Sequence, residues 1–338
     1  MPVVAGRSRV ATTHGIVAAS QPLAARAGVQ ILEHGGNAVD AAIAANAVLG
    51  VTEPQSNGIG GDLFAIVYDA KSGTLHGLNA SGWAPRALTP ALLASLGVTS
   101  MPQNGIHSVT VPGAVAGWEA LRARLGRLPL SVLLAPAIQY AAEGFPVSDV
   151  IAAHWATLAE KLRAEPLAAA LYLPDGRPPR AGEIFRNPDL ARSLTTIGRG
   201  GAAAFYRGPI ADAIVAASRQ RDGTLDDADL LEFEPEWVDP ISTTYRGWTV
   251  YELPPNTQGI AALLMLNLME QFPLAEYGFH SARALHVMIE AKKLAYADML
   301  RYVGDQRFAA TDVTALLDKG AAKARAALID PRRAATNV

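Results

Sequence analysis

The order of elements around one glycine-rich loop constrains the fold of this chain more than any other feature. Residues 38–49 are almost entirely Ala, Val and Ile, which predicts a helix that is buried on every side. The loop 51–62 is rich in Gly, Pro and Asn and leads into the apolar run 63–69, which predicts a buried strand. This strand is predicted to turn at 71–73 and to return over 74–79 as a hairpin. The glycines between helix and strand allow close approach of backbone segments.

The sequence Gly58-Ile59-Gly60-Gly61 within this loop suggests a phosphate-binding turn at first sight. A dinucleotide site requires a strand, then the glycine turn, then a helix, so that the phosphate meets the helix N-terminus. Here the order is helix, loop, strand, and no Gly-Lys-Ser/Thr follows as in a Walker loop. We therefore interpret the loop as a close-packed structural element, with Asp62 as a buried or loop-capping carboxylate.

Composition excludes several classes of function. Half of the 338 residues are hydrophobic and 18% are charged, which is typical of a well-packed globular protein. The formal net charge is −2 without a basic block, so nucleic-acid binding is not predicted. The absence of cysteine rules out disulfides and thiolate metal sites. No apolar run has the length of a membrane span, and no signal peptide is visible near Met1, so a cytoplasmic location is expected.

The remaining elements are mostly helices, which indicates an α+β fold rich in helix. A second hairpin is predicted from 241–245 and 248–253. Because an isolated hairpin is marginally stable, both hairpins are expected to need partner strands from elsewhere. Residues 329–338 are polar and unpatterned, which predicts a frayed linker. Helices are predicted over 18–33, 90–96, 114–125, 132–142, 148–164, 187–197, 209–219, 260–271, 281–302 and 314–328, and a strand over 108–111.

No catalytic or metal-binding constellation can be identified from residue types and spacing. The acidic cluster at 223–227 fits a helix cap formed by Thr224 and Asp227 better than a metal site, since no further ligand lies at suitable spacing. The seven histidines are scattered. Neither a nucleophile–base pair nor a carboxylate dyad is recognisable, and no cofactor or metal is expected. The residues alone predict a mixed α and β protein that is incomplete without a partner.

Several segments, taken together and in this order, resemble the large subunit of the γ-glutamyltransferase family, whose members are also called γ-glutamyl transpeptidases or glutathione hydrolases. The likeness extends roughly from residue 10 to residue 310. The segments are 34–42, 54–64, 111–118, 135–138 with 143–147, 204–208, 245–247 with 254–255 and 259, 290–291, 296–298 and 304–305.

This resemblance implies an N-terminal-nucleophile hydrolase. Its αββα sandwich has two sheets between helical layers and is built jointly by two subunits that arise when a precursor cuts itself. Residues 1–328 would form the large (α) subunit. The nucleophile would be the N-terminal Thr of the small (β) subunit, with its own α-amino group as base. Thr336 is internal and is not a candidate, so no catalytic residue is expected in this chain. The implied reaction cleaves or transfers a γ-glutamyl-type acyl group of a small amide such as glutathione.

The resemblance also locates candidate substrate-binding residues. In the family, an Arg that clamps the substrate's α-carboxylate lies just before an Ala-Pro pair. Alignment on Ala84-Pro85 places Ser81 at that position, so a charge-assisted contact is lost. Either the neighbouring Arg86 takes over, or substrate choice has shifted to other amides, as in acylases that remove glutaryl-type side chains from cephalosporins.

Further candidates flank this position or lie in a second loop. Asn79, Gly82 and Trp83 surround Ser81, and Trp83 either walls an acyl pocket or packs at the hairpin end. In the loop 256–258, Thr257 and Gln258 precede a helix and either face substrate or act as a plain cap. A hypothesis from another class is a non-catalytic scaffold descended from the family, which would purify without a small subunit.

Overall fold

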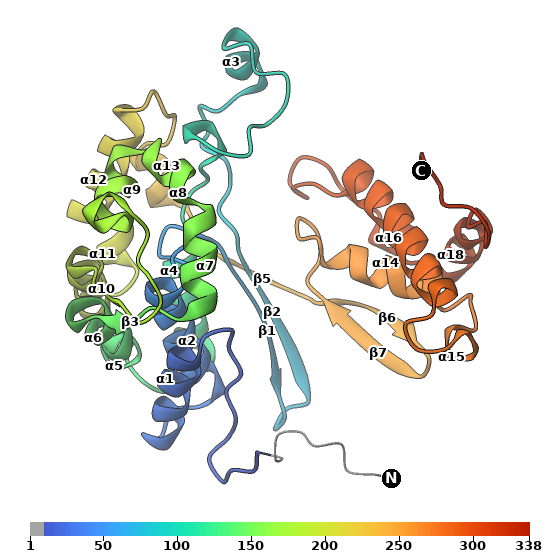
Figure 1. The fold of residues 1–338 in the computed structure, drawn as a ribbon, viewed down its shortest axis with the longest axis horizontal. Helices are drawn as coiled ribbons and strands as arrows, with labels where there is room; N and C mark the ends of the chain where they lie inside the picture. Colours follow the sequence, from blue (N-terminus) through green and yellow to red (C-terminus); the bar gives the residue numbers. More distant parts are fainter. Residues whose placement is uncertain (1–9) are drawn as a thin grey trace. The chain divides into compact units, whose positions relative to one another are not determined.

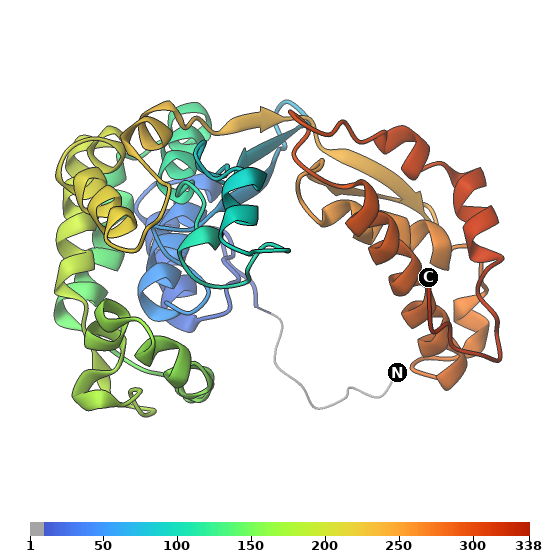
Figure 2. The ribbon, with the colours of Figure 1, turned by 90° about the horizontal axis from the view of Figure 1, so that it is seen from above.

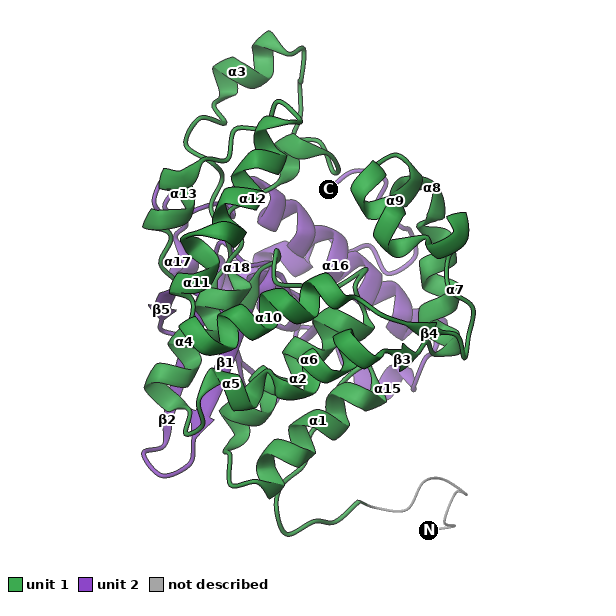
Figure 3. Ribbon diagram, turned by 90° about the vertical axis from the view of Figure 1, so that its left-hand side faces the viewer, with its two compact units in different colours: residues 1–63, 80–235 green, residues 64–79, 236–338 purple. Residues whose placement is uncertain are grey.

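The computed structural model describes residues 10–338, which form two compact units (Figures 1 and 3). Unit 1 contains the described residues up to 63 together with residues 80–235, and unit 2 contains residues 64–79 and 236–338. The chain therefore leaves unit 1 at the first hairpin and returns to it directly afterwards. None of the helices in the described part of the chain is long and apolar enough to cross a membrane.

Unit 1 is helical apart from one short strand pair, β3–β4. Its central helix α2 packs against α1, α4, α5 and α6. The elements are α1 (Pro22–Glu33), α2 (Ala38–Thr52), α3 (Pro90–Ser95), η1 (Ile106–Ser108), α4 (Ala114–Leu125), α5 (Leu130–Leu133), α6 (Ala135–Glu143), β3 (Phe145–Pro146), α7 (Asp149–Thr157), α8 (Ala159–Arg163), α9 (Pro166–Tyr172), η2 (Pro174–Gly176), β4 (Ile184–Phe185), α10 (Pro188–Gly200), α11 (Ala203–Tyr206), α12 (Pro209–Arg219) and α13 (Asp227–Glu232).

The start of α2 is fixed by a fully buried carboxylate. The side chain of Asn37 accepts hydrogen bonds from the first turn, and Asp40 Oδ2 accepts one from the Asn37 N–H at 2.9 Å, which completes a capping box. Asp40 Oδ1 also accepts hydrogen bonds from the backbone N–H groups of Arg127 at 3.0 Å and Leu128 at 3.4 Å. One buried side chain therefore joins the N-terminus of α2 to the loop after α4.

We expect Asp40→Ala to lower the free energy of unfolding by about 3 kcal/mol, because it empties a fully buried position and leaves the backbone N–H groups of Asn37, Arg127 and Leu128 without their acceptor. Asp40→Asn keeps one oxygen and is expected to lose less. Asp149→Ala is the matched control, since Asp149 is an exposed first-turn acid of α7. Urea unfolding of the three variants measures the differences. Equal losses for Asp40→Ala and Asp149→Ala would contradict the assigned role of Asp40.

Unit 2 contains two small sheets and the C-terminal helices. The first hairpin gains a third strand, so that the sheet order is β1-β2-β5, while β6 and β7 pair with each other. Strand β5 pairs antiparallel with β2, with Leu78 opposite Trp237. The elements are β1 (Leu63–Asp69), β2 (Thr74–Ala80), β5 (Glu236–Val238), β6 (Ile241–Tyr245), β7 (Trp248–Glu252), α14 (Gly259–Met269), α15 (Leu274–Tyr277), α16 (Ala282–Tyr302), α17 (Val313–Leu316) and α18 (Lys319–Ala326).

The core of unit 2 lies where α14 packs against α16, α18 and the β6–β7 hairpin (Figure 2). Its buried members include Ile260, Leu264 and Ala291. Polar groups join the hairpin to the helices: Lys319 Nζ of α18 donates to the Thr244 carbonyl of β6 at 2.5 Å, and the Thr243 hydroxyl of β6 donates to Asn267 Oδ1 of α14 at 2.6 Å. This mixture of helices and small sheets confirms the predicted helix-rich α+β class.

Several predicted elements were wrong in detail. Residues 108–111 form no strand; Ser108 ends the 3-10 turn η1 instead. The helix predicted over 314–328 is two helices, because Asp318 caps the N-terminus of α18 with its side chain. The helices predicted over 132–142 and 148–164 are likewise each divided in two. The capping box predicted for Thr224 and Asp227 is formed by Asp226 and Asp229.

The segment predicted to be a frayed linker, residues 329–338, contacts α16. Ile329 is buried, and Asp330 O lies 2.7 Å from the ring nitrogen Nε2 of His286. Further along, Ala335 N–H donates to Glu290 Oε2 at 3.1 Å, and Lys293 Nζ donates to the Ala335 carbonyl at 2.8 Å. These contacts hold the segment against the helix, which the polar sequence did not indicate.

Candidate functional site

The segment 81–83, which contains three of the predicted substrate-binding residues, lies in unit 1 directly after β2. It packs tightly against residues 111–113. A Cβ atom on Gly82 would lie 1.5 Å from the Val111 carbonyl oxygen, and one on Gly113 would lie 1.9 Å from the Ala80 carbonyl oxygen. The Val111 N–H donates to the Trp83 carbonyl at 3.0 Å. Glycine at both positions is therefore required by the close approach of the two backbones.

The glycine-rich loop is tied to these segments by backbone hydrogen bonds. The Gly61 carbonyl accepts from the N–H groups of Gly113 and Ala114, both at 2.9 Å. Asp62 Oδ1 accepts from the Gly82 N–H at 3.3 Å. Asp62 is thus a loop-capping carboxylate, which is one of the two roles predicted for it, and it is exposed rather than buried. The prediction of a structural loop fits these contacts.

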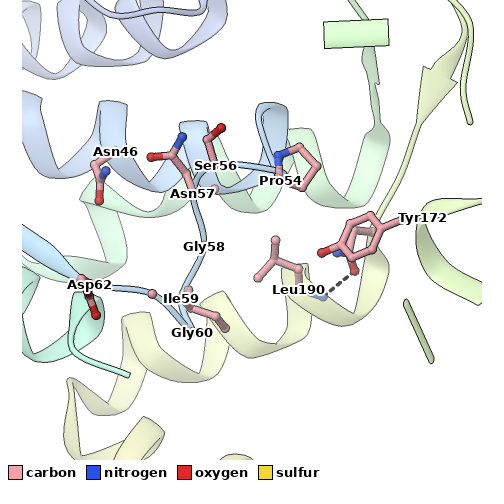
Figure 4. A pocket seen from close by; sticks show the side chains of 13 residues that line it. Asn46, Pro54, Ser56, Asn57, Gly58, Ile59, Gly60, Asp62, Tyr172 and Leu190 are labelled. Atoms are coloured by element: carbon pink, nitrogen blue, oxygen red, sulfur yellow. Dashed lines mark hydrogen bonds between the residues drawn. The ribbon is translucent and has the colours of Figure 1, made fainter. Parts of the chain in front are cut away.

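The same loop also lines a polar cavity of about 430 Å³ within unit 1 (Figure 4). Asn46, Asn57 and Tyr172 contribute side-chain polar groups to its wall. Asn46 is held in place because its Oδ1 accepts from Trp118 Nε1 at 2.8 Å. Burial raises the pKa of the Tyr172 hydroxyl, so it stays a neutral donor. The lining therefore combines neutral hydrogen-bonding side chains with one carboxylate, that of Asp62.

Sequence reasoning missed two of these wall residues, Tyr172 and Asn187. Both lie more than a hundred residues after the loop, and neither belongs to a recognisable motif. Asn187 had been assigned only to a helix start, and its Oδ1 does accept from the Leu190 N–H at 3.0 Å (dashed in Figure 4).

Trp83 packs against buried aromatic side chains. Its ring meets Phe233 edge-on with a centroid distance of 5.2 Å, and Phe233 stacks in turn on Tyr206. The Tyr206 hydroxyl donates to the Pro112 carbonyl at 2.5 Å. Burial raises the pKa of Tyr206 well above its usual range. These contacts favour the packing interpretation of Trp83 over that of an open acyl-pocket wall.

Arg86, the proposed substitute for the family's carboxylate clamp, is committed elsewhere. Its guanidinium forms a two-pronged ion pair with Glu232, and its backbone N–H donates to Asp229 Oδ1 at 3.0 Å. The pair is solvent-exposed, and a surface pair of this kind contributes little to stability. It nevertheless orients the guanidinium toward α13.

The remaining predicted residues belong to unit 2. Asn79 Nδ2 donates to Asn256 Oδ1 at 2.9 Å, which joins β2 to the loop before α14. The Thr257 hydroxyl lies 3.1 Å from the Leu253 carbonyl and accepts from the Gly259 N–H at 3.3 Å, so it caps this loop. Gln258 is exposed at the N-cap position of α14. The structure thus brings Asn79 together with the second loop, whereas Ser81, Gly82 and Trp83 form part of unit 1.

Comparisons with known proteins extend over nearly the whole chain. The family profile described as Gamma-glutamyltranspeptidase matches residues 24–338. The glutathione hydrolase-like YwrD proenzyme of Bacillus subtilis (strain 168) is 36% identical over 312 residues, which are 92% of this chain and 59% of that protein. This chain therefore spans less than two thirds of the length of such curated relatives.

Two solved structures are similar throughout. A cephalosporin acylase from Bacillus halodurans matches with a TM-score of 0.91 and 42% identity, over 98% of this chain and 62% of that chain. A γ-glutamyltranspeptidase from Helicobacter pylori matches with a TM-score of 0.91 and 30% identity, over 97% of this chain and 95% of that chain.

Proposed function

This chain belongs to the γ-glutamyltranspeptidase family, and we propose that it is the large-subunit part of an N-terminal-nucleophile hydrolase. The enzyme would cleave or transfer a γ-glutamyl-type acyl group from a small amide such as glutathione. Its nucleophile would be the N-terminal Thr of a small subunit, whose α-amino group removes the hydroxyl proton. The proposed reaction requires no metal or cofactor, and we place it in the cytoplasm.

The coverage of the relatives supports the division into two subunits. The matched region fills 95% of the Helicobacter pylori chain but only 62% of the Bacillus halodurans chain. The same fold thus occurs both as a chain of about this size and as part of a longer one. We place the small subunit in the portion of the longer relatives that this chain does not match.

The observation that carries the proposal is an apolar face on strand β1. Phe64, Ile66 and Tyr68 alternate along the strand and therefore share one face of it, and they are 43%, 41% and 64% exposed. β1 is also the edge strand of its sheet in the described part of the chain. Soluble proteins rarely leave an apolar edge strand open. We infer that strands of the small subunit cover this face and complete the two-sheet sandwich.

A second candidate function is favoured by the residues at the clamp position. Ser81 offers a hydroxyl at the position that the resemblance assigns to the family's guanidinium, and Arg86 is engaged with Glu232. Such a site would bind an amino-acid head group weakly. The alternative is therefore an acylase that hydrolyses non-glutamyl amides, in line with the 42% identity to the cephalosporin acylase structure.

The two candidates are separated by a rate comparison on the complete two-subunit enzyme. γ-Glutamyl-p-nitroanilide and glutaryl-p-nitroanilide differ only by the α-amino group. A strong preference for the γ-glutamyl compound would support the transpeptidase, because the head group is then recognised. A flat ratio or a glutaryl preference would support the acylase.

In the same enzyme, Ser81→Arg is expected to raise the ratio of glutaryl-p-nitroanilide to valeryl-p-nitroanilide turnover about tenfold, because the new guanidinium would contact the carboxylate that only the glutaryl compound carries, and a charge-assisted contact contributes roughly 1.5 kcal/mol or more. Ser81→Gln is the control, since it adds length and hydrogen-bonding capacity without charge. An unchanged ratio in Ser81→Arg would show that residue 81 does not occupy the clamp position.

A further inference from the structure

A second cavity in unit 1 has features of a binding site. It encloses about 660 Å³, within the range typical of small-molecule pockets. One wall is a face of α12 and its C-terminal extension, on which Ile214, Ala217, Ser218 and Arg221 recur at helical spacing. The facing walls come from the loop around η1 and from the junction of α8 and α9.

The wall contains one buried polar group without a partner. Ser218 is 4% exposed, and among the described residues its hydroxyl makes no hydrogen bond. Its backbone is engaged, since the Ser218 carbonyl accepts from Gly223 N–H at 2.9 Å. A buried hydroxyl without a partner costs folding free energy. The hydroxyl oxygen itself is buried, so a ligand oxygen would supply the missing partner once the Ser218 side chain turns toward the cavity.

The charged groups around the cavity favour an anion. Its lining includes two cations, Lys161 and Arg221, and one carboxylate, Glu165. Arg221 Nε donates to Glu165 Oε2 at 3.1 Å, which neutralises that carboxylate. Lys161 is exposed and, in the described part of the chain, makes no ion pair. One positive charge therefore remains uncompensated beside an apolar wall formed by Ile106, Leu167 and Leu225.

We propose that this cavity binds a small monocarboxylic acid with an apolar body, such as a medium-chain or aryl-substituted alkanoic acid. The apolar part would lie along Ile106, Ala217 and Leu225. The carboxylate would meet Lys161 and Arg221 at the rim. One of its two oxygens would accept a hydrogen bond from the Ser218 hydroxyl. This assignment rests on unit 1 alone and does not depend on the reaction proposed above.

The test is calorimetric titration of the complete protein with octanoate, with 1-octanol and octylamine as probes of the charge requirement. Octanoate is expected to bind, and octylamine is not. Lys161→Met is expected to weaken octanoate binding about tenfold, the equivalent of one charge-assisted contact, while leaving binding of octanol unchanged. Equal binding of octanoate and octylamine would overturn the proposed charge selection.

Two helix variants test the location. Ala217→Phe fills the cavity and is expected to weaken octanoate binding more than tenfold, by blocking the apolar wall. Ala213→Phe is its control, because Ala213 is exposed on α12 outside the cavity. Ser218→Ala should weaken octanoate binding without lowering the melting temperature, since it removes an unsatisfied hydroxyl. Binding that persists in Ala217→Phe, or that is absent in the unmodified protein, would overturn the proposal.

Discussion

Gly82→Ala is expected to destabilise unit 1 by more than about 4 kcal/mol, which corresponds to roughly 10 °C in melting temperature for a domain of this size. The new Cβ would lie 1.5 Å from the Val111 carbonyl oxygen and 2.5 Å from its carbonyl carbon. Neither atom belongs to a side chain that can rotate away. The Val111 N–H is also bonded to the Trp83 carbonyl at 3.0 Å, so relief would require breaking that bond.

The matched control for this variant is Gly60→Ala. Gly60 belongs to the glycine-rich loop, and a Cβ there would have no atom within 4 Å. We expect it to change stability by less than about 1 kcal/mol. Thermal unfolding followed by circular dichroism compares the two. If the Gly82→Ala and Gly60→Ala proteins have the same melting temperature, residues 81–83 do not pack against residues 111–113 as described.

Most secondary structure could be predicted because it is encoded locally. The bounds of α4 and α12 agree with the predicted helices, since a glycine or proline marks each start and the apolar periodicity continues to each end. Both hairpins were found from their alternation and their turn residues. Three strands were missed, because Phe145–Pro146, Ile184–Phe185 and Glu236–Val238 are too short to show a pattern.

The segment 108–111 shows why a local pattern is insufficient. Val109 is extended, as its β-branched neighbours predict, with φ −79° and ψ 127°. A strand also needs a ladder of partners, and Val111 instead makes a single backbone hydrogen bond to Trp83. Similarly, the helix predicted over 314–328 is interrupted at Asp318, because the Asp318 side chain caps the N-terminus of α18. Helix propensity alone does not predict whether an Asp lies inside a helix or caps one.

The geometry of the candidate site could not be predicted from the sequence, because it is formed by contacts between segments that are distant in the chain. Sequence and family resemblance together pointed to Ser81 and its neighbours, but spacing did not reveal that Gly82 approaches Val111 or that Gly61 binds Gly113. These contacts explain why glycine is needed at position 82. The role of Gly82 in binding substrate remains a prediction. The walls of the loop cavity at Tyr172 and Asn187 were likewise set by tertiary packing.

The proposed enzyme is expected to hydrolyse γ-glutamyl-p-nitroanilide or glutaryl-p-nitroanilide only when this chain is assembled with a small subunit that begins with Thr. Replacing that N-terminal Thr by Ala is expected to lower kcat by at least about 10³-fold, because it removes the attacking hydroxyl, whereas Ser should retain part of the rate. Thr336→Ala in this chain is the matched control. Thr336 is an exposed threonine near the end of the chain, and its loss should leave kcat unchanged.

The outcomes separate the enzyme from the scaffold hypothesis. If the assembled pair turns over either substrate and the Thr-to-Ala change abolishes it, the nucleophile lies on the small subunit and this chain supplies binding and support. If no small subunit associates and neither amide is hydrolysed, the scaffold is favoured, and the exposed Phe64, Ile66 and Tyr68 must be covered by another partner. If Thr336→Ala alone removes activity, the nucleophile has been misplaced.

The apolar face of β1 allows a second, independent measurement, the affinity of this chain for the subunit that covers that face. Tyr68→Lys should weaken this association, because it places a charge in the apolar face.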